Sequence, residues 1–258
     1  MKSKFKQIIF LIFSLLSSAL FSDTEGYVNN KGTKIFYIDY GPANNEPILL
    51  VQGLGGQLTF WPDELINLLK VNGFRPIVYD NRDVGLSDGF QEYGRPNFVW
   101  NYFKFYTGLP LKSAYSLADM ASDGIAVIDK LELEQTHLLA MSMGGMITQR
   151  MVADNGKRFK SYVLVASMAR TPDLQTGPKG ELKKLIEERS FRTQTIDERL
   201  ERSLKMYKIL GTPDTQFNEE EFKKNALFNI NRSSNESGFT RQLIAILADK
   251  DRYEEVEA

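Results

Sequence analysis

Residues 137–150 (HLLAMSMGGMITQR) place Ser142 between a short apolar run and a segment with a helical pattern. A serine at a sharp strand-to-helix turn presents its hydroxyl at the carboxyl end of a sheet, in a sparsely populated backbone conformation. Strand and helix backbones nearly touch there, so small residues are needed two positions before and after the serine. Ala140 and Gly144 meet this need, and Gly145 adds room. The spacing predicts that Ser142 is a nucleophile; the alternative is a helix cap, since serine is a preferred N-cap.

A glycine-rich loop (VQGLGGQLTFW) follows the apolar run at residues 47–53. Backbone N–H groups of such a loop can point toward the mouth of a site, and the oxyanion of a tetrahedral intermediate needs two donors. By this geometry the donors are the N–H of Met143, directly after the serine, and the N–H of Leu54. The GLGG pattern lacks the GxGxxG spacing of a dinucleotide-binding loop, so we expect no nucleotide cofactor here.

The general base that a serine hydroxyl needs is not evident in the sequence. The one histidine, His137, precedes Ser142 by five residues. In a strand that rises about 3.3 Å per residue, the two residues lie about 16 Å apart. A general base must lie within about 3.2 Å of the proton that it takes, or reach it through one water. We therefore expect His137 to be a residue at the start of the strand, without a catalytic role.

Composition excludes several other kinds of chemistry. The chain of 258 residues has no cysteine, which excludes disulfides, thiolate metal sites and a cysteine nucleophile. The formal net charge is −1 and no strongly basic block is present, so we expect no nucleic acid partner. A single histidine argues against a histidine-based zinc site. We expect neither a metal nor a cofactor.

The first 22 residues have the pattern of a secretory signal peptide. Lysines precede the apolar run at residues 8–16, and small residues follow it. As a helix, residues 8–21 would span about 21 Å, against roughly 30 Å of bilayer hydrocarbon. We expect an exported protein with no stable membrane span after removal of this segment. Cleavage after Ala19 and after Ser22 both remain open, and an uncleaved membrane anchor is the alternative.

Apolar strands alternate with helical patterns around these residues. The expected strands cover 47–53, 75–80, 136–141 and 161–167, the expected helices cover 62–73, 116–133 and 143–156, and a hairpin turns at 30–32. Strands that are apolar on both faces and alternate with helices predict an α/β fold with a mostly parallel sheet and helices on both sides. Ser116 and Asp119 predict a capping box. In the polar turn after the second strand, we expect Asp80 and Arg82 to brace the loop.

Four motifs in this order and spacing resemble the α/β-hydrolase fold family: PILLVQGLGG, YDNRDVGLSD, YSLADMASDGIAVIDKL and THLLAMSMGGMITQ. Within that family, the pattern is most similar to carboxylesterases related to aclacinomycin methylesterase. The resemblance covers residues 27–169 well and later residues only by position. It implies the nucleophile and oxyanion-hole roles given above. The departures are Gln52, where many members have histidine, and Ala140 in place of glycine, and neither removes a catalytic group.

The resemblance also implies a domain organisation: a signal peptide at 1–22, an α/β-hydrolase core at 23–170 and a helical lid at 171–258. Helical patterns in the lid cover 180–189, 197–210, 219–230 and 239–250. Family members carry the acid and the histidine on loops after later strands. Some relatives place the acid near Asp173, for which an ordinary loop aspartate is the alternative. We expect a chain truncated before the final core strands, either a fragment or a natural protein without its catalytic end.

Together, these features predict an exported serine hydrolase, a carboxylesterase for a small or medium apolar ester. The lid carries large apolar side chains that either line the substrate or pack the lid helices: Phe191, Met206, Tyr207, Phe222, Phe228 and Phe239. Because no acid and no histidine are placed, we expect this chain alone to be inactive. The alternative is a non-catalytic binding protein on the same fold.

Overall fold

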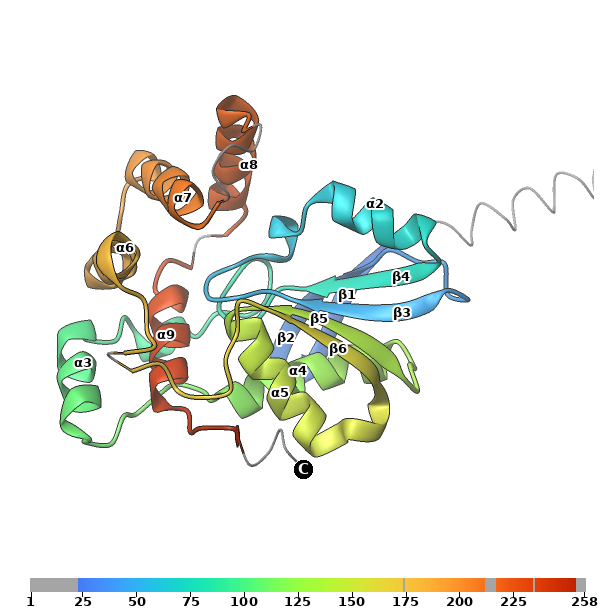
Figure 1. Ribbon diagram of the computed structural model, residues 1–258, viewed down its shortest axis with the longest axis horizontal. Coiled ribbons are helices and arrows are strands. Elements are labelled where there is room, and N and C mark those ends of the chain that lie inside the picture. Colours follow the sequence, from blue (N-terminus) through green and yellow to red (C-terminus); the bar gives the residue numbers. More distant parts are fainter. Residues whose placement is uncertain (1–22, 174, 212–216, 234, 254–258) are drawn as a thin grey trace, which may run out of the picture.

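The computed structural model describes residues 23–173, 175–211, 217–233 and 235–253, and the predicted signal peptide lies outside these ranges. Six strands within them form one sheet in the order β1-β2-β4-β3-β5-β6 (Figure 1). The strands are β1 (Thr24–Asn30), β2 (Thr33–Asp39), β3 (Glu46–Val51), β4 (Phe74–Tyr79), β5 (Thr136–Met141) and β6 (Phe159–Val165). Strands β4, β3, β5 and β6 are parallel neighbours, whereas β1 and β2 pair antiparallel. The predicted mostly parallel sheet is therefore confirmed.

The antiparallel pair β1–β2 is the predicted hairpin. Its turn needs two residues with positive φ, and Lys31 (50°) and Gly32 (93°) supply them. Positive φ at both central residues matches the right-handed twist of the flanking strands, which is why such turns close two-residue hairpins.

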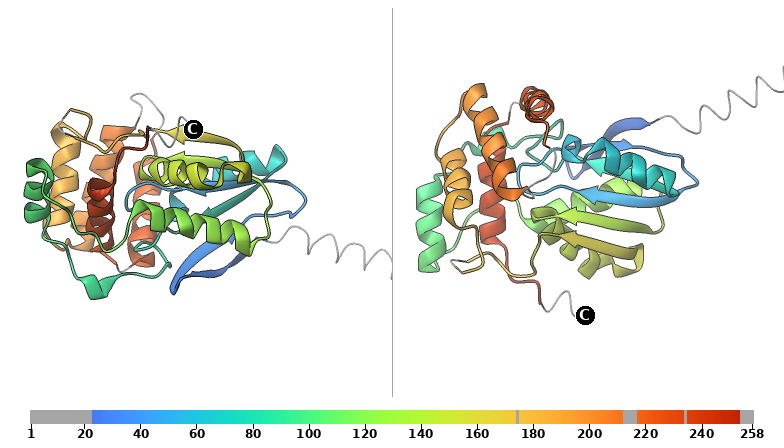
Figure 2. Two further views of the ribbon diagram at one scale, coloured as in Figure 1. Left: turned by 90° about the horizontal axis from the view of Figure 1, so that it is seen from below. Right: turned by 45° about the horizontal axis from the view of Figure 1, so that its top comes forward.

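Helices cover both faces of the sheet (Figures 1 and 2). Helix α2 (Asp63–Val71) lies on one face, and α4 (Leu117–Lys130) and α5 (Met143–Asn155) lie on the other. Strand β3 shows why its sequence is apolar throughout: Leu50 packs in the core cluster on the α2 side, whereas Leu49 packs in the cluster on the side of α4 and α5. Burial of each such side chain stabilises the fold by about 1.5–3 kcal/mol.

Helix α4 begins at the predicted capping box. The Ser116 Oγ accepts a hydrogen bond from the Asp119 N–H (3.1 Å), and the Asp119 carboxylate accepts one from the Ser116 N–H (2.8 Å). This reciprocal pair satisfies two N–H groups that a helix start otherwise leaves without partners.

Five further helices gather beyond the carboxyl edge of the sheet (Figure 1). They are α3 (Phe98–Thr107), α6 (Gly180–Phe191), α7 (Ile196–Leu210), α8 (Glu219–Arg232) and α9 (Gly238–Ala248). Short 3-10 turns lie at Leu58–Phe60, Gln91–Tyr93 and Gly156–Arg158. The last four helices begin and end within about two residues of their predicted positions. Helix α9 packs into the core, because Ala245 and Ile246 belong to the same cluster as α4 and α5.

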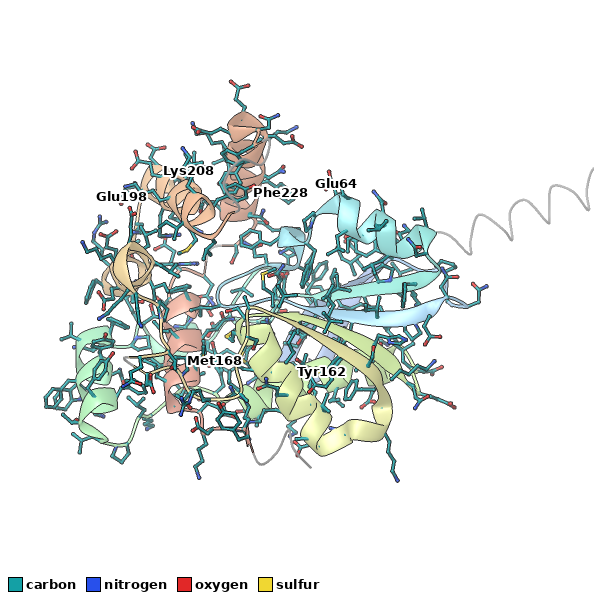
Figure 3. All side chains as sticks on the ribbon, viewed as in Figure 1. Glu64, Tyr162, Met168, Glu198, Lys208 and Phe228 are labelled. Atoms are coloured by element: carbon teal, nitrogen blue, oxygen red, sulfur yellow. The ribbon has the colours of Figure 1, made fainter. Side chains whose placement is uncertain are left out.

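Strand β6 forms one edge of the sheet within the described residues, where it pairs with β5 alone. Its apolar side chains Tyr162, Val163 and Val165 are 37, 53 and 41% exposed, and Tyr162 is labelled in Figure 3. None of the helices in the described ranges is both long enough and apolar enough to cross a bilayer.

Candidate active site

Ser142 lies in the turn between β5 and α5 with backbone angles φ 51° and ψ −119°. Positive φ is disfavoured for a residue with a Cβ, so this turn stores strain that the surrounding structure must hold. Its N–H donates to the Val165 carbonyl at the end of β6 (2.9 Å). The serine side chain makes no capping hydrogen bond to α5. The helix-cap alternative therefore does not describe Ser142, and its hydroxyl remains available for another role.

The small residues around Ser142 are where the predicted close approach requires them. A methyl group on Gly144 would lie 2.2 Å from the Val51 carbonyl oxygen, and one on Gly145 would lie 2.3 Å from Ser167 Oγ. Ala140 is fully buried and pairs with Val51 in the neighbouring strand. Helix α5 thus begins in contact with the ends of β3 and β6, and this contact fixes the direction of the turn.

The glycine-rich loop after β3 lies beside Ser142. A methyl group on Gly53 would lie 3.6 Å from Ser142 Oγ, and Leu54 is the next residue. Within the described part of the chain, the N–H groups of Leu54 and Met143 have no hydrogen-bond acceptor. Two uncommitted donors next to a serine hydroxyl match what a tetrahedral oxyanion requires.

Gln242, on α9, holds this loop in place. The Gly55 N–H donates to Gln242 Oε1 (2.8 Å), and Gln242 Nε2 donates to the Arg82 carbonyl (2.9 Å). Gln242 is fully buried, so both hydrogen bonds satisfy groups that have no access to water. No local pattern in the sequence identifies it, because Gly55 lies 187 residues away.

The turn after β4 braces the loop, as expected for Asp80. The Asp80 carboxylate accepts the N–H groups of Leu58 (2.8 Å) and Leu86 (2.9 Å) and pairs with Arg232 of α8 at 2.8 Å. Burial raises the pKa of Asp80, although Arg232 and the two N–H groups oppose this shift. Gly85 has φ 59°, and a methyl group there would lie 2.0 Å from an Asp80 oxygen. The turn therefore requires glycine at this position.

Two buried arginine–aspartate pairs complete this brace. Arg82 donates two hydrogen bonds to Asp123 (2.7 and 2.8 Å). Arg241 of α9 donates two to Asp83 (both 2.8 Å), and both side chains are almost fully buried. Burial alone would raise the pKa of Asp83, but hydrogen bonds from Arg241, the Phe90 N–H and a tyrosine hydroxyl lower it. Asp83 and Arg241 were not expected from the sequence, because their pairing joins segments 158 residues apart.

His137 lies at the start of β5, at the end of the strand remote from Ser142. Its Nδ1 is 2.7 Å from Ser161 Oγ, and its Nε2 is 3.5 Å from Glu46 Oε1. These partners agree with the expected non-catalytic position. Asp173 accepts hydrogen bonds from N–H groups two and three residues later, and these bonds lower its pKa. Its carboxylate is thus used inside its own exposed loop, which favours the ordinary loop aspartate.

The large apolar side chains of the predicted lid differ in their surroundings. Tyr207 and Phe222 pack against each other at 4.9 Å between ring centroids. Phe228 is 59% exposed on α8 (Figure 3). Phe239 is buried and would lie 2.7 Å from a methyl group on Gly55, so it borders the glycine-rich loop.

A polar cavity of about 260 Å³ lies between the segment after β4 and the segment before α9, and neither Ser142 nor the glycine-rich loop lines it. It is lined by Gln91, Gly94, Arg95, Thr193, Asn235, Glu236, Ser237 and Arg241. Within the described ranges, no group of three or more histidine, aspartate or glutamate side chains is arranged to hold a metal ion.

Residues 46–189 match the family model described as the alpha/beta hydrolase fold, which is more than half of the chain. The chain therefore belongs to the α/β-hydrolase family. It is similar to rhodomycin D methylesterase DauP of Streptomyces sp. (strain C5), with 25% identity over 203 residues, 72% of this chain and 62% of that relative. It is also similar to rhodomycin D methylesterase DnrP of Streptomyces peucetius, with 24% identity over 216 residues, 78% of this chain and 66% of that one.

These two relatives confirm the predicted resemblance to an esterase family, and the chain spans less than two thirds of the length of either. Among solved structures, the esterase EaEST from Exiguobacterium antarcticum superposes with a TM-score of 0.62. Its sequence identity is 22%, and the match covers 90% of this chain and 76% of that one. At this identity the likeness supports the fold.

Proposed function

We propose that the chain is a serine hydrolase of the carboxylesterase type, with Ser142 as its nucleophile. Ser142 Oγ attacks the ester carbonyl carbon and forms an acyl-serine, while the bond to the alcohol breaks and the serine proton leaves with that alcohol. Water then releases the acid. The N–H groups of Leu54 and Met143 stabilise the negative charge on the carbonyl oxygen in both steps.

The backbone of Ser142 is the observation that carries this proposal. A serine held at φ 51° has no structural advantage over glycine, yet its hydroxyl does not cap the helix that it begins. The strain is accounted for if the turn serves to present the hydroxyl beside two uncommitted donors.

We further propose that the 258-residue chain turns over esters at a rate close to background. The single histidine is bound at the other end of β5, and a serine hydroxyl without an adjacent base is a weak nucleophile. In a studied serine protease, loss of the base lowers turnover by on the order of 10⁶, and the remaining groups retain about 10³–10⁴ over water. A non-catalytic binding protein is the second candidate, favoured by the position of the single histidine at the far end of β5.

The test compares the 258-residue chain with its Ser142→Ala variant. We expect similar rates of p-nitrophenyl butyrate hydrolysis, and a slow phosphonate adduct on Ser142 that imidazole, as an external base, accelerates. Intact mass and peptide mapping locate the adduct, with the variant as the control. A fast Ser142-dependent hydrolysis would show that a base has been misplaced. No adduct on Ser142, even with imidazole, would favour the binding protein.

The physiological setting is also a proposal. The N-terminal pattern supports export to the periplasm or the outside of the cell, with α6–α8 acting as a lid over the site. The substrate is a small or medium ester with an apolar part, because Phe239 borders the loop beside Ser142. Both methylesterase relatives support an ester as the substrate class.

A further inference from the structure

Four arginines gather around one glutamate where α6 and α7 meet the segment before α9. Glu236 lies 3.7 Å from Arg95 and 3.6 Å from Arg199. Arg189, on α6, and Arg202, on α7, have no carboxylate within ion-pair distance among the described residues. These five residues carry a formal excess of three positive charges, which the neighbouring Glu188 offsets in part at Arg202. Figure 1 shows α6 and α7 side by side above α9, and α6 contacts both helices.

The positive charges of Arg189 and Arg202 lie in buried surroundings that disfavour a charged side chain. Arg202 is only 9% exposed, and the Arg189 guanidinium stacks 3.9 Å from the centroid of the Phe239 ring. Burial, followed by repulsion from Arg202 and Arg199, lowers the pKa of Arg189 well below its ordinary value. Burial and repulsion from Arg199 likewise lower the pKa of Arg202 to about 10. Buried charges without partners are costly and concentrate at functional sites.

Arg189 also lies against the loop beside Ser142. Its Nη1 would be 2.9 Å from a methyl group on Gly55, and a methyl group on Gly53 would be 3.6 Å from Ser142 Oγ. The path from the Arg189 guanidinium through Gly55 and Gly53 to Ser142 Oγ includes two steps between adjacent Cα atoms, each about 3.8 Å. The guanidinium therefore lies at most about 17 Å from the serine hydroxyl. The polar cavity of about 260 Å³, lined by Arg95 and Glu236, adjoins this arginine group.

We propose that Arg189, supported by Arg199 and Arg202, binds a carboxylate of the substrate. The substrate would then be an ester whose acyl or alcohol part ends in a carboxylate, with its apolar body against Phe239 and its ester group at Ser142. A guanidinium binds a carboxylate through two parallel hydrogen bonds, and the excess positive charge explains why an anion is needed there. This inference rests on the proposed function for the position of the ester group.

The experiment measures binding and does not depend on turnover. Monomethyl adipate and the neutral dimethyl adipate are titrated into the 258-residue Ser142→Ala chain by calorimetry at about 0.15 M salt, where exposed charges are largely screened. We expect the monoester to bind about tenfold or more tightly than the diester. Arg189→Gln should abolish this preference. Arg192→Gln should retain it, because Arg192 is exposed and pairs with Glu198 at 2.6 Å.

Two readouts keep the inference testable if Arg189→Gln folds poorly. Arg202→Gln is a second variant that should reduce the same preference, and the thermal midpoint of each variant shows whether it is folded. Equal affinity for both adipate esters would overturn the inference, as would a preference that survives both substitutions in folded protein. Every titration uses Ser142→Ala and so does not depend on the nucleophile. If the monoester shows no preference, the proposal that Ser142 is the nucleophile is unaffected. If the phosphonate does not label Ser142, a measured preference for the monoester still stands.

Discussion

Gly144→Ala and Gly156→Ala make the same substitution at the two ends of one helix, and we expect opposite results. Alanine is normally favoured over glycine in a helix by about 0.5–1 kcal/mol. At Gly144 the new methyl group would lie 2.2 Å from the Val51 carbonyl oxygen and 2.8 Å from that of Gln52. Both are backbone atoms of the sheet. A carbon–oxygen contact is normally about 3.3 Å or longer, so helix and strand must separate by about 1 Å.

We expect this separation to destabilise Gly144→Ala by about 2–3 kcal/mol, within the range measured for overpacked cores. For a domain of this size, that loss lowers the thermal midpoint by about 4–12 °C. Gly156 ends α5 with φ −49°, and a methyl group there meets no atom within 4 Å. Gly156→Ala should therefore leave the midpoint unchanged or raise it slightly. Differential scanning calorimetry measures the thermal midpoint of each variant. Equal midpoints for Gly144→Ala and Gly156→Ala would refute the close approach of α5 to β3.

Two further predictions concern the ion pairs and the sheet edge. Arg241→Met should destabilise the fold by about 3–5 kcal/mol in chemical denaturation, because it leaves the Asp83 carboxylate buried without its partner. Since the pKa of Asp83 is lowered in the folded protein, the stabilisation that its carboxylate contributes is present above about pH 4 and is lost as the pH falls through the pKa of the folded state. The difference in unfolding free energy between Arg241→Met and the unsubstituted protein should therefore shrink on acidification. A difference that stays constant between pH 7 and pH 3 would contradict the pairing of Arg241 with an ionised Asp83. On β6, Val163→Lys should suppress concentration-dependent association in light scattering at an unchanged thermal midpoint, because Val163 is 53% exposed on a sheet edge. Val71→Lys, at a valine that is 79% exposed on α2, is the control, and association reduced equally by both substitutions would show that the edge is not responsible.

The features that the sequence predicts well are those specified by adjacent residues. The Ser142 turn is encoded within residues 137–150, and the helix cap is encoded by Ser116 and Asp119, three positions apart. Apolar runs that are buried on both faces likewise mark the strands without knowledge of their neighbours. In such elements, the residues that make the stabilising contacts are the same residues that form the recognisable sequence pattern.

Contacts between distant segments leave no such signal. Arg241 and Gln242 are polar residues on a helix, and by pattern alone they belong on its solvent face, yet both are buried against loops 158–187 residues away. Helix α3 is not predicted either. Its side chains Trp100 and Phe103 stack on each other at 5.4 Å and are about half exposed, so the helix lacks the usual division into an apolar and a polar face.

The hydrogen bond from the Gly55 N–H to Gln242 also has a consequence for the timing of biosynthesis. The turn at Ser142 can close once Val165 has left the ribosome, because that residue accepts its N–H. The loop that carries Leu54 is fixed only when Gln242 emerges, 187 residues after Gly55. Gln242 follows Val165 by 77 residues, so at about 5–20 residues per second the turn can close about 4–15 s before the loop is fixed. If Ser142 is the nucleophile, a nascent chain therefore acquires its attacking group well before its oxyanion hole, and it cannot stabilise an acyl-transfer transition state during that interval.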